Sequence, residues 1–178
     1  KGAWTVGYVS AVIDQGKSEV DMLNDNQKKR LLEIARKTIE EYLTTSKVPE
    51  FKEDDPKLKE VCGAFVTLHK HGDLRGCIGN IIGQEPLYLT VRNMAIESAT
   101  GDPRFPKVTK DELKDIEIEI SALSPLKKIK DISEFELGVH GVIVRQGWHQ
   151  GVFLPQVATE TGWTKEEFLS NLCVQKAG

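Results

Sequence analysis

Three short motifs hold the residue types best suited to chemistry, and the first is the hexapeptide LRGCIG at residues 74–79. A thiol attacks as its thiolate, which a neighbouring cation stabilises, so Cys77 is a candidate nucleophile. Arg75, two residues earlier on the same face of an extended strand, is the cation that would assist it. Gly76 and Gly79 would let a substrate approach the backbone closely. The structural alternative is that Cys77 is a buried apolar residue and the glycines make room for packing.

The second motif, GDPRFP at residues 101–106, pairs an acid with a base. Asp102 can cap the residues that follow it or hold Arg104 in a bidentate ion pair. In a functional role, Arg104 would offer its guanidinium to a phosphate or carboxylate, and convergence with Arg75 would favour phosphorylated or nucleotide-like substrates. In a structural role, the same pair would lock a loop against a sheet, with Phe105 as an apolar plug. Both roles stay open.

The third motif, FLPQV at residues 153–157, contributes Gln156. Its neutral amide suits hydrogen-bond recognition of a substrate, so Gln156 joins the candidate substrate-binding residues. The structural alternative is that Pro155 ends a strand and Gln156 starts a helix.

The histidines supply no recognisable metal pattern. His69 and His71 form a His-x-His pair at an expected turn, and no Glu or Asp near it is spaced in a known metal-binding pattern. We therefore predict no metal site and no cofactor. His140 is the one base that we would pair with Cys77, but the sequence does not bring the two together.

The motifs lie on and between elements that the apolar pattern predicts. Apolar residues recur at helical spacing after Asn24 or Asp25, either of which can cap a helix. Extended runs around turn residues predict two hairpins, and alternation of isoleucine with glutamate predicts a half-buried strand. In chain order we expect a helix over 24–43, a hairpin turning at 71–73 with Cys77 on its returning strand, a helix over 86–99, a strand over 116–123, a hairpin around 146–147 and helical turns over 157–173.

The order hairpin then helix occurs twice in this list of elements. It predicts an α+β fold built from duplicated strand-helix units. The repeat aligns LRGCI with HQGVF, so that Val152 stands where the first copy has Cys77. An ordinary apolar residue can therefore fill the same position as the thiol.

Length and composition limit the classes of function. A chain of 178 residues with 39% hydrophobic content can build one real core. Its net charge of -3 provides no broad cationic field for nucleic acid, so any such binding must be local. No apolar run approaches the roughly 20 residues that span a bilayer. The odd number of cysteines, without a Cys-x-x-Cys pair, is typical of a reducing compartment, so we expect a cytoplasmic protein with no membrane partner.

The N-terminal residues differ in pattern from the rest. Residues 1–20 begin with a strand-like apolar run and continue as a polar linker. We therefore expect them to be the tail of a preceding element, with the domain itself over residues 21–178.

With LRGCIG, GDPRFP and FLPQV in this order, the chain resembles the AMMECR domain family, also called AmmeMemoRadiSam system protein A, over about residues 25–178. The resemblance implies two unequal subdomains, a barrel-like antiparallel sheet with flanking helices, and motifs near the groove between the subdomains. It also implies a radical-SAM protein and a Memo-like protein as partners. The family usually continues into a further strand, so the domain would be C-terminally short. Residues 1–14 resemble the end of a Memo-like or extradiol-dioxygenase domain.

Two functions from different classes follow. The first is an enzyme that uses Cys77 to act on a nucleotide-like or other anionic substrate, with RNA or another macromolecule as the modified partner. The second is a non-catalytic module in which the same groove holds a peptide, nucleic acid or a partner protein. The enzyme needs an accessible thiol, whereas the module tolerates a buried one.

Overall fold

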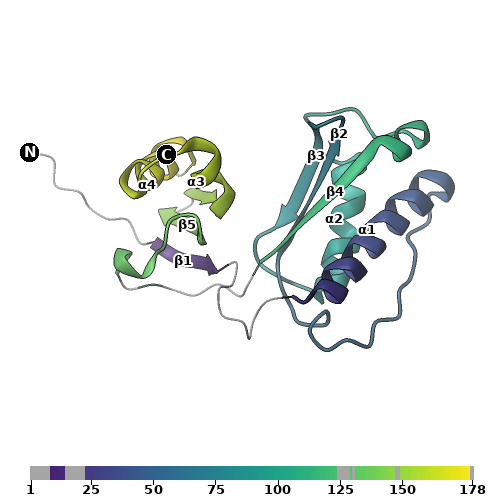
Figure 1. Ribbon diagram of the computed structural model, residues 1–178, viewed down its shortest axis with the longest axis horizontal. Coiled ribbons are helices and arrows are strands. Elements are labelled where there is room, and N and C mark those ends of the chain that lie inside the picture. Colours follow the sequence, from purple (N-terminus) through teal and green to yellow (C-terminus); the bar gives the residue numbers. More distant parts are fainter. Residues whose placement is uncertain (1–8, 15–22, 124–128, 130, 147–148, 177–178) are drawn as a thin grey trace, which may run out of the picture. The chain divides into compact units, whose positions relative to one another are not determined.

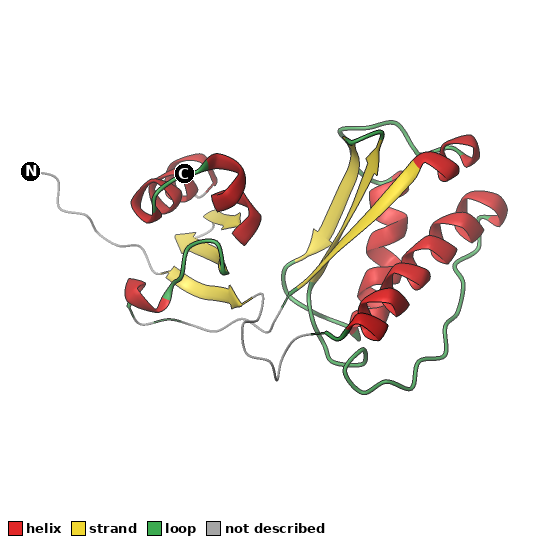
Figure 2. Ribbon diagram, in the orientation of Figure 1, coloured by secondary structure: helices red, strands yellow, loops and turns green. Residues whose placement is uncertain are grey.

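The computed structural model describes residues 9–14, 23–123, 129, 131–146 and 149–176 (Figure 1). The chain forms two compact units of unequal size. The larger unit comprises residues 23–123, and the smaller unit comprises residues 1–22 together with 124–178. Both contain helices and antiparallel strands (Figure 2), so the fold is α+β, as the sequence predicts.

In the larger unit, two helices pack on one face of a three-stranded antiparallel sheet (Figure 2). The strand order is β3-β2-β4, so β2 is central and β3 and β4 are the edge strands. The elements are, in chain order, α1 (Asp25–Thr45), β2 (Ala64–Lys70), β3 (Asp73–Asn80), α2 (Leu87–Thr100), the 3-10 helix η1 (Lys110–Asp115) and β4 (Ile116–Ala122).

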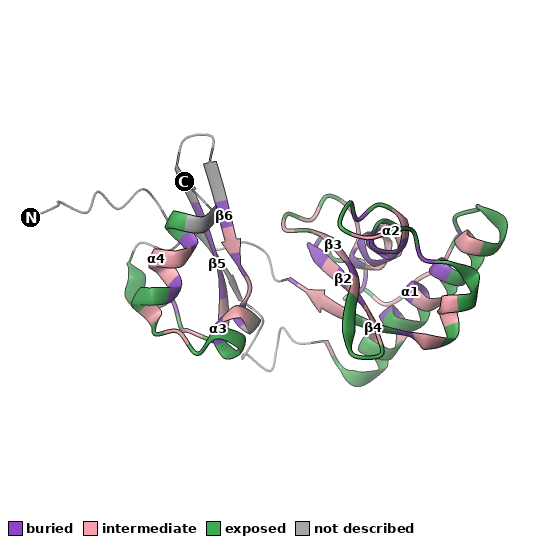
Figure 3. Ribbon diagram, turned by 90° about the horizontal axis from the view of Figure 1, so that it is seen from above, coloured by how far each residue is buried: buried purple, intermediate pink, exposed green. Residues whose placement is uncertain are grey.

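Helix α1 begins where its capping signal predicts. Asn24 Oδ1 accepts a hydrogen bond from the Gln27 backbone N–H at 3.0 Å, and Gln27 Oε1 accepts one from the Asn24 N–H at 2.9 Å. This capping box satisfies two donors that a helix start otherwise leaves unpaired. Leu31, Ala35 and Ile39 form the buried stripe, and exposed residues follow the opposite side of α1 (Figure 3).

The predicted hairpin at residues 71–73 is confirmed. His71 and Gly72 have φ angles of 54° and 87°, and two consecutive positive values are what a two-residue type I′ turn requires. His71 is exposed in this turn.

A β-bulge follows the turn on β3. Arg75 is the extra residue between the cross-strand pairs Leu68–Gly76 and His69–Leu74. A bulge redirects the side chains beside it. It therefore interrupts the strict alternation by which Arg75 and Cys77 would share one face.

Strand β4 shows the alternation that its sequence predicts. Ile116, Ile118 and Ile120 pack toward the helices, whereas Glu117 and Glu119 are exposed. The core of the larger unit lies between the helices and the sheet, and its fully buried side chains include Leu31, Ile39, Val66, Leu68, Val91 and Ala95.

The smaller unit has its own sheet of three antiparallel strands, in the order β1-β5-β6. Its core is aromatic, since Phe153 meets Phe168 edge to face at 5.2 Å between ring centroids and Phe135 stacks on Phe168 at 5.6 Å. The elements are β1 (Val9–Asp14), the 3-10 helix η2 (Ile132–Glu134), β5 (His140–Gln146), β6 (His149–Phe153), α3 (Pro155–Thr161) and α4 (Lys165–Lys176).

Both units repeat one order of elements, a hairpin followed by a helix, as the sequence predicts. In each unit the first hairpin strand is the central strand of its sheet. The expectation of a barrel-like sheet needs correction, because the described strands form two open sheets and no closed barrel. Three strands are too few to close around a core.

The N-terminal stretch contributes one described strand. This strand, β1, pairs with β5. The expected domain boundary after residue 20 stays a prediction. Among the described residues, no helix combines the length and apolar character needed to cross a membrane.

Candidate functional site

Cys77 lies in the middle of the edge strand β3, on the sheet face opposite the helices. It pairs with Thr67 of β2, and the two side chains meet there, with Thr67 Oγ1 3.2 Å from Cys77 Sγ. Glu119 of β4 is the next residue along the same row across the sheet. The Cys77 side chain is partly exposed, so the thiol is not sealed in the core.

The backbone of Cys77 is held from outside the sheet. Cys77 and Thr67 form a cross-strand pair without mutual backbone hydrogen bonds. In such a pair, the backbone N–H and C=O groups of each residue point away from the partner strand. The Cys77 N–H accordingly donates to Asp102 Oδ2 at 2.9 Å, and Cys77 O accepts from Arg104 Nη2 at 3.2 Å. Asp102 and Arg104 thus occupy the hydrogen-bonding position that a further strand would take.

Asp102 and Arg104 form the bidentate pair expected from their sequence. Arg104 Nε lies 3.0 Å from Asp102 Oδ1, and Nη2 lies 2.7 Å from Oδ2. Oδ1 also accepts the Arg104 backbone N–H at 3.1 Å, so the buried carboxylate has four donors around it. Hydrogen bonding from Arg104 holds the pKa of Asp102 well below its usual range, against the effect of burial.

Arg104 itself is largely open to solvent, with 55% of its side chain exposed. Its guanidinium lies over the Phe105 ring at 5.4 Å from the centroid. Hydrogen bonding to Asp102 raises the pKa of Arg104, against the effect of burial. Because its Nη2 donates to the Cys77 carbonyl oxygen, Arg104 is the cation that lies beside Cys77.

Arg75 is committed to other partners. Its guanidinium donates to both carboxylate oxygens of Glu112, at 3.1 and 3.0 Å, and to the carbonyl oxygens of Pro106 and Lys107. Lys70 Nζ adds a third contact to Glu112 at 2.9 Å. Hydrogen bonding from Arg75 holds the pKa of Glu112 well below its usual range. This network fastens β3 to the segment before β4, and none of these contacts includes Cys77.

The two glycines of the hexapeptide have neighbours where a side chain would stand. A Cβ added to Gly76 would lie 2.1 Å from the carbonyl oxygen of Ser98 on α2, and one added to Gly79 would lie 2.3 Å from the Phe65 ring. Ser98 Oγ also accepts the Ile78 N–H at 2.9 Å and donates to Val66 O at 2.6 Å. Close contact between helix and sheet accounts for Gly76 without a ligand.

Two further candidates lie in the smaller unit. Gln156 belongs to α3, which begins at Pro155, one residue before the start that the structural alternative predicts, and its side chain lies outside the described part of the structure. His140 begins β5, where its Nδ1 accepts the Glu136 N–H at 2.9 Å. Within the described residues, no group of three or more histidine, cysteine or acidic side chains is arranged to hold a metal ion.

Sequence reasoning missed three residues that hold the motif strand: Thr67, Ser98 and Glu112. The signal for Glu112 was present, because Thr109 and Glu112 have the spacing of a capping box and Glu112 Oε2 accepts the Thr109 N–H at 2.9 Å. For Thr67 and Ser98, no local pattern indicates a partner on another strand.

Comparisons with known proteins agree on one family. Residues 32–178 match the AMMECR1 family. A protein of Methanothermobacter thermautotrophicus is 45% identical over 163 residues, covering 88% of this chain and 84% of that protein. A protein of Methanopyrus kandleri is 45% identical over 157 residues, covering 83% of this chain and 75% of that protein. The crystal structure of the uncharacterised protein PH0010 from Pyrococcus horikoshii is similar with a TM-score of 0.79 and 40% identity, covering 88% of this chain and 82% of that one.

Proposed function

The chain belongs to the AMMECR1 family, and we propose that its larger unit is a binding module that holds an anionic group at Arg104, beside the Cys77 thiol. The ligand class is a phosphate or carboxylate, and a nucleotide-like molecule is the ligand that the sequence leads us to expect. With a net charge of -3, the chain suits a small or local anion better than a long nucleic acid.

The state of the Arg104 guanidinium carries this proposal. Asp102 and the Cys77 carbonyl engage Nε and Nη2, whereas Nη1 has no partner among the described residues. A guanidinium held in place on one side loses little conformational freedom when its other side binds an anion. The Thr67 hydroxyl and the Cys77 thiol, 3.2 Å apart, are polar groups on the adjoining sheet face.

The same geometry leaves one arginine, instead of two, for the anion pocket considered from the sequence. That pocket is conditional on convergence of Arg75 with Arg104, but Arg75 is bound to Glu112 and two carbonyl groups. A single arginine supports weak binding of a lone phosphate. A tight ligand must therefore make further contacts on the open face of the sheet.

Titration of inorganic phosphate and of a mononucleotide, followed by the amide resonance of Cys77, tests the proposal. That amide donates to Asp102, so it reports directly on the Asp102–Arg104 pair. We expect saturable shifts in the wild type and at least tenfold weaker binding in Arg104→Ala. Arg92→Ala, which removes an arginine that is bound to Asn93 on α2, is the matched control. Equal binding in the wild type and Arg104→Ala, or no binding in either, would contradict the proposal.

An enzyme that uses Cys77 is the second candidate, favoured by the partly exposed thiol beside Thr67 and by the contact of Arg104 with the Cys77 carbonyl oxygen. If Arg104 and Thr67 activate the thiol, iodoacetamide should alkylate Cys77 more slowly in Arg104→Ala and Thr67→Val than in the wild type. The measurement uses chains in which Cys62 and Cys173 are replaced by alanine. Unchanged rates in both variants would leave Cys77 without an activating environment.

The larger partners implied by the family resemblance, a radical-SAM protein and a Memo-like protein, stay predictions. Modification of RNA or of another macromolecule stays a prediction too. Co-purification from cells that encode both proteins is the direct test of the partners.

A further inference from the structure

We propose that the outer edge of β4 binds an extended peptide segment of another protein, in which apolar and basic side chains alternate. The segment would add a fourth strand to the sheet of the larger unit. This edge is opposite the β3 edge that holds Cys77, so the inference does not depend on the proposed function.

The orientation of the β4 backbone follows from the pairing with β2. Leu123 donates its N–H to Gly63 O at 2.9 Å, so the odd-numbered residues of this strand direct their backbone groups toward β2. The even-numbered residues therefore direct theirs outward. An independent contact agrees, because Arg36 on α1 donates from Nη2 to the outward carbonyl oxygen of Ile116.

Beyond Ile116, both Ile118 and Ile120 present an open hydrogen-bonding edge. Among the described residues, the outward N–H and C=O groups of Ile118 and Ile120 have no partner. The β3 edge differs, since Asp102 and Arg104 engage its central residue. Unpaired donors and acceptors along an edge strand match the backbone of another extended chain.

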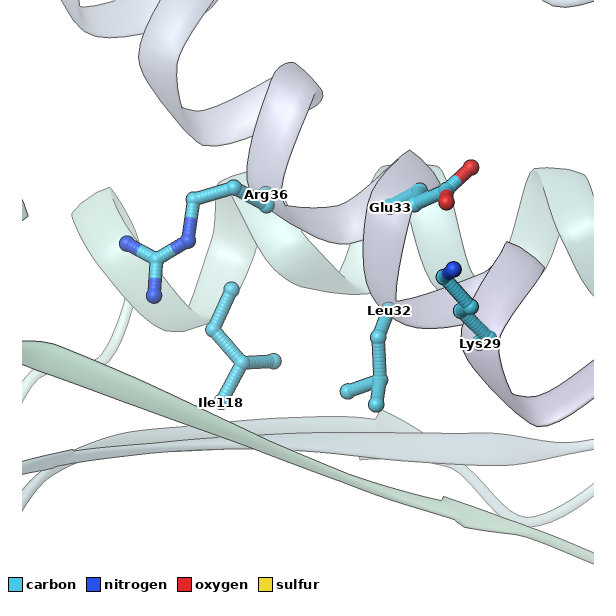
Figure 4. A pocket seen from close by; sticks show the side chains of 5 residues that line it. All are labelled: Lys29, Leu32, Glu33, Arg36 and Ile118. Atoms are coloured by element: carbon cyan, nitrogen blue, oxygen red, sulfur yellow. The ribbon is translucent and has the colours of Figure 1, made fainter. Parts of the chain in front are cut away.

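A groove lies beside this edge, between α1 and β4 (Figure 4). Its volume is about 350 Å³. Leu32 points from α1 toward the sheet, Ile118 points from β4 toward α1, and 40% of Leu32 is exposed. The charged side chains of Lys29, Glu33 and Arg36 line the rest. Residues of an added strand directly opposite Ile118 and Ile120 would direct their side chains to this face, where apolar groups would cover Leu32.

The charged residues on the opposite face of β4 indicate which charge the bound segment should carry. Glu117 and Glu119 are exposed there. The intervening residues of an added strand would stand beside them, within cross-strand contact distance, so lysine or arginine fits these positions.

The same charges argue against two of the registers in which a second copy of this chain could be the occupant. When two β4 strands pair antiparallel with Ile118 opposite Ile118, Glu117 faces Glu119. When Ile118 is opposite Ile120, Glu119 faces Glu119. Like charges directly opposite each other destabilise strand pairing.

Fluorescence anisotropy with a labelled ten-residue peptide of alternating valine and lysine, blocked at both ends, tests the proposal on the full chain. We expect the segment to pair antiparallel with β4, as the other strands of this sheet pair. Valine then lies opposite Ile118 and Ile120, with its N–H directed at β4, whereas the lysine N–H points away. N-methylation of the valines should therefore weaken binding by at least about tenfold, while N-methylation of the lysines should leave it nearly unchanged. Equal binding of the two methylated peptides would show a non-specific charge interaction and overturn the proposal.

Charge reversal supplies the second arm. The double variant Glu117→Lys and Glu119→Lys should bind the valine-lysine peptide about tenfold more weakly and gain affinity for a valine-glutamate peptide. The control is Glu160→Lys with Glu166→Lys, an equal change of charge at exposed residues of the smaller unit. All four positions are exposed, and thermal unfolding checks that the variants stay folded. Absence of binding, or the same loss in both double variants, would refute the proposal.

Sedimentation of the chain without peptide tests the alternative that a second copy of the chain occupies the β4 edge. A dimer that dissociates when Ile118 and Ile120 are both replaced by proline, which removes their outward N–H groups, would assign the edge to a second copy and overturn the peptide proposal. A monomer at all concentrations is the expected result.

Discussion

Asp102 Oδ2 lies 2.9 Å from the backbone nitrogen of Cys77, so a buried carboxylate on the loop after α2 holds the centre of the edge strand β3. Arg104 completes the contact by donating to the carbonyl oxygen of the same cysteine. One ion pair therefore satisfies both outward backbone groups of Cys77 and keeps one side of a guanidinium exposed next to the thiol. Structural support and a candidate binding group are combined in two side chains.

Replacement of Asp102 by asparagine should lower the free energy of unfolding by about 3 kcal/mol. In the wild type, the carboxylate oxygens accept hydrogen bonds from N–H donors, whereas the asparagine amide would direct its own N–H groups at some of these donors. Urea unfolding followed by circular dichroism measures the change. Asp111→Asn, at an exposed position of η1, should be nearly neutral. Similar stabilities of the two variants would mean that the Asp102 contacts contribute little.

Gly76→Ala should destabilise the chain by about 2 kcal/mol or more, since the added methyl group meets the backbone carbonyl of Ser98 at 2.1 Å. Gly101→Ala is the matched comparison, because its nearest neighbour is the flexible end of the Glu97 side chain, at 2.2 Å. That side chain can rotate away, so the cost should stay below about 1 kcal/mol. Thermal unfolding measures the change in stability of both variants. If Gly76→Ala is as stable as the wild type, α2 and β3 can move apart without loss of stability.

Glu112→Gln should reduce stability in a manner that depends on pH. Arg75 holds the pKa of Glu112 below its usual range, so this carboxylate stabilises the fold fully above its unfolded pKa of about 4.3. The contribution is lost as pH falls from that value toward the folded pKa. We expect a difference of about 2 kcal/mol between wild type and variant at pH 7, and a smaller one at pH 3, by urea unfolding. A difference that stays constant over this range would exclude charge as its source.

The three cysteines should react with iodoacetamide in the order of their accessibility. Cys173 is exposed, Cys77 is partly exposed, and Cys62 is buried, with a pKa that burial raises. In the folded protein at pH 8, mass spectrometry of single-cysteine variants should find Cys173 fastest and Cys62 slowest. If Cys77 stays unmodified until urea unfolds the chain, its thiol is closed to reagents and an enzyme that uses it is excluded.

Much of the fold could be predicted because its signals are local. The Asn24 cap, the turn at His71 and Gly72, and the isoleucine–glutamate alternation of β4 each act through backbone geometry or burial within a few residues. Asp102 and Arg104 are two residues apart, so their pairing could also be anticipated.

The partner of Arg75 could not be predicted in this way. Strand alternation placed its side chain beside Cys77, but the bulge on β3 interrupts the alternation, and the guanidinium binds Glu112, 37 residues away in sequence. The contact between Ser98 and Gly76 and the open edge of β4 equally depend on which strands are neighbours.

By itself, the sequence determined the α+β class, the succession of helices and hairpins, and the family motifs, since caps, turns and apolar periodicity act over short stretches of chain. Only the tertiary structure decided which cation lies beside the thiol, which glycines contact a neighbouring element, and which strand edge is left open. These features follow from the order of strands in the sheet and from one extra residue in β3, because both set which distant backbone and side-chain groups come within hydrogen-bonding distance.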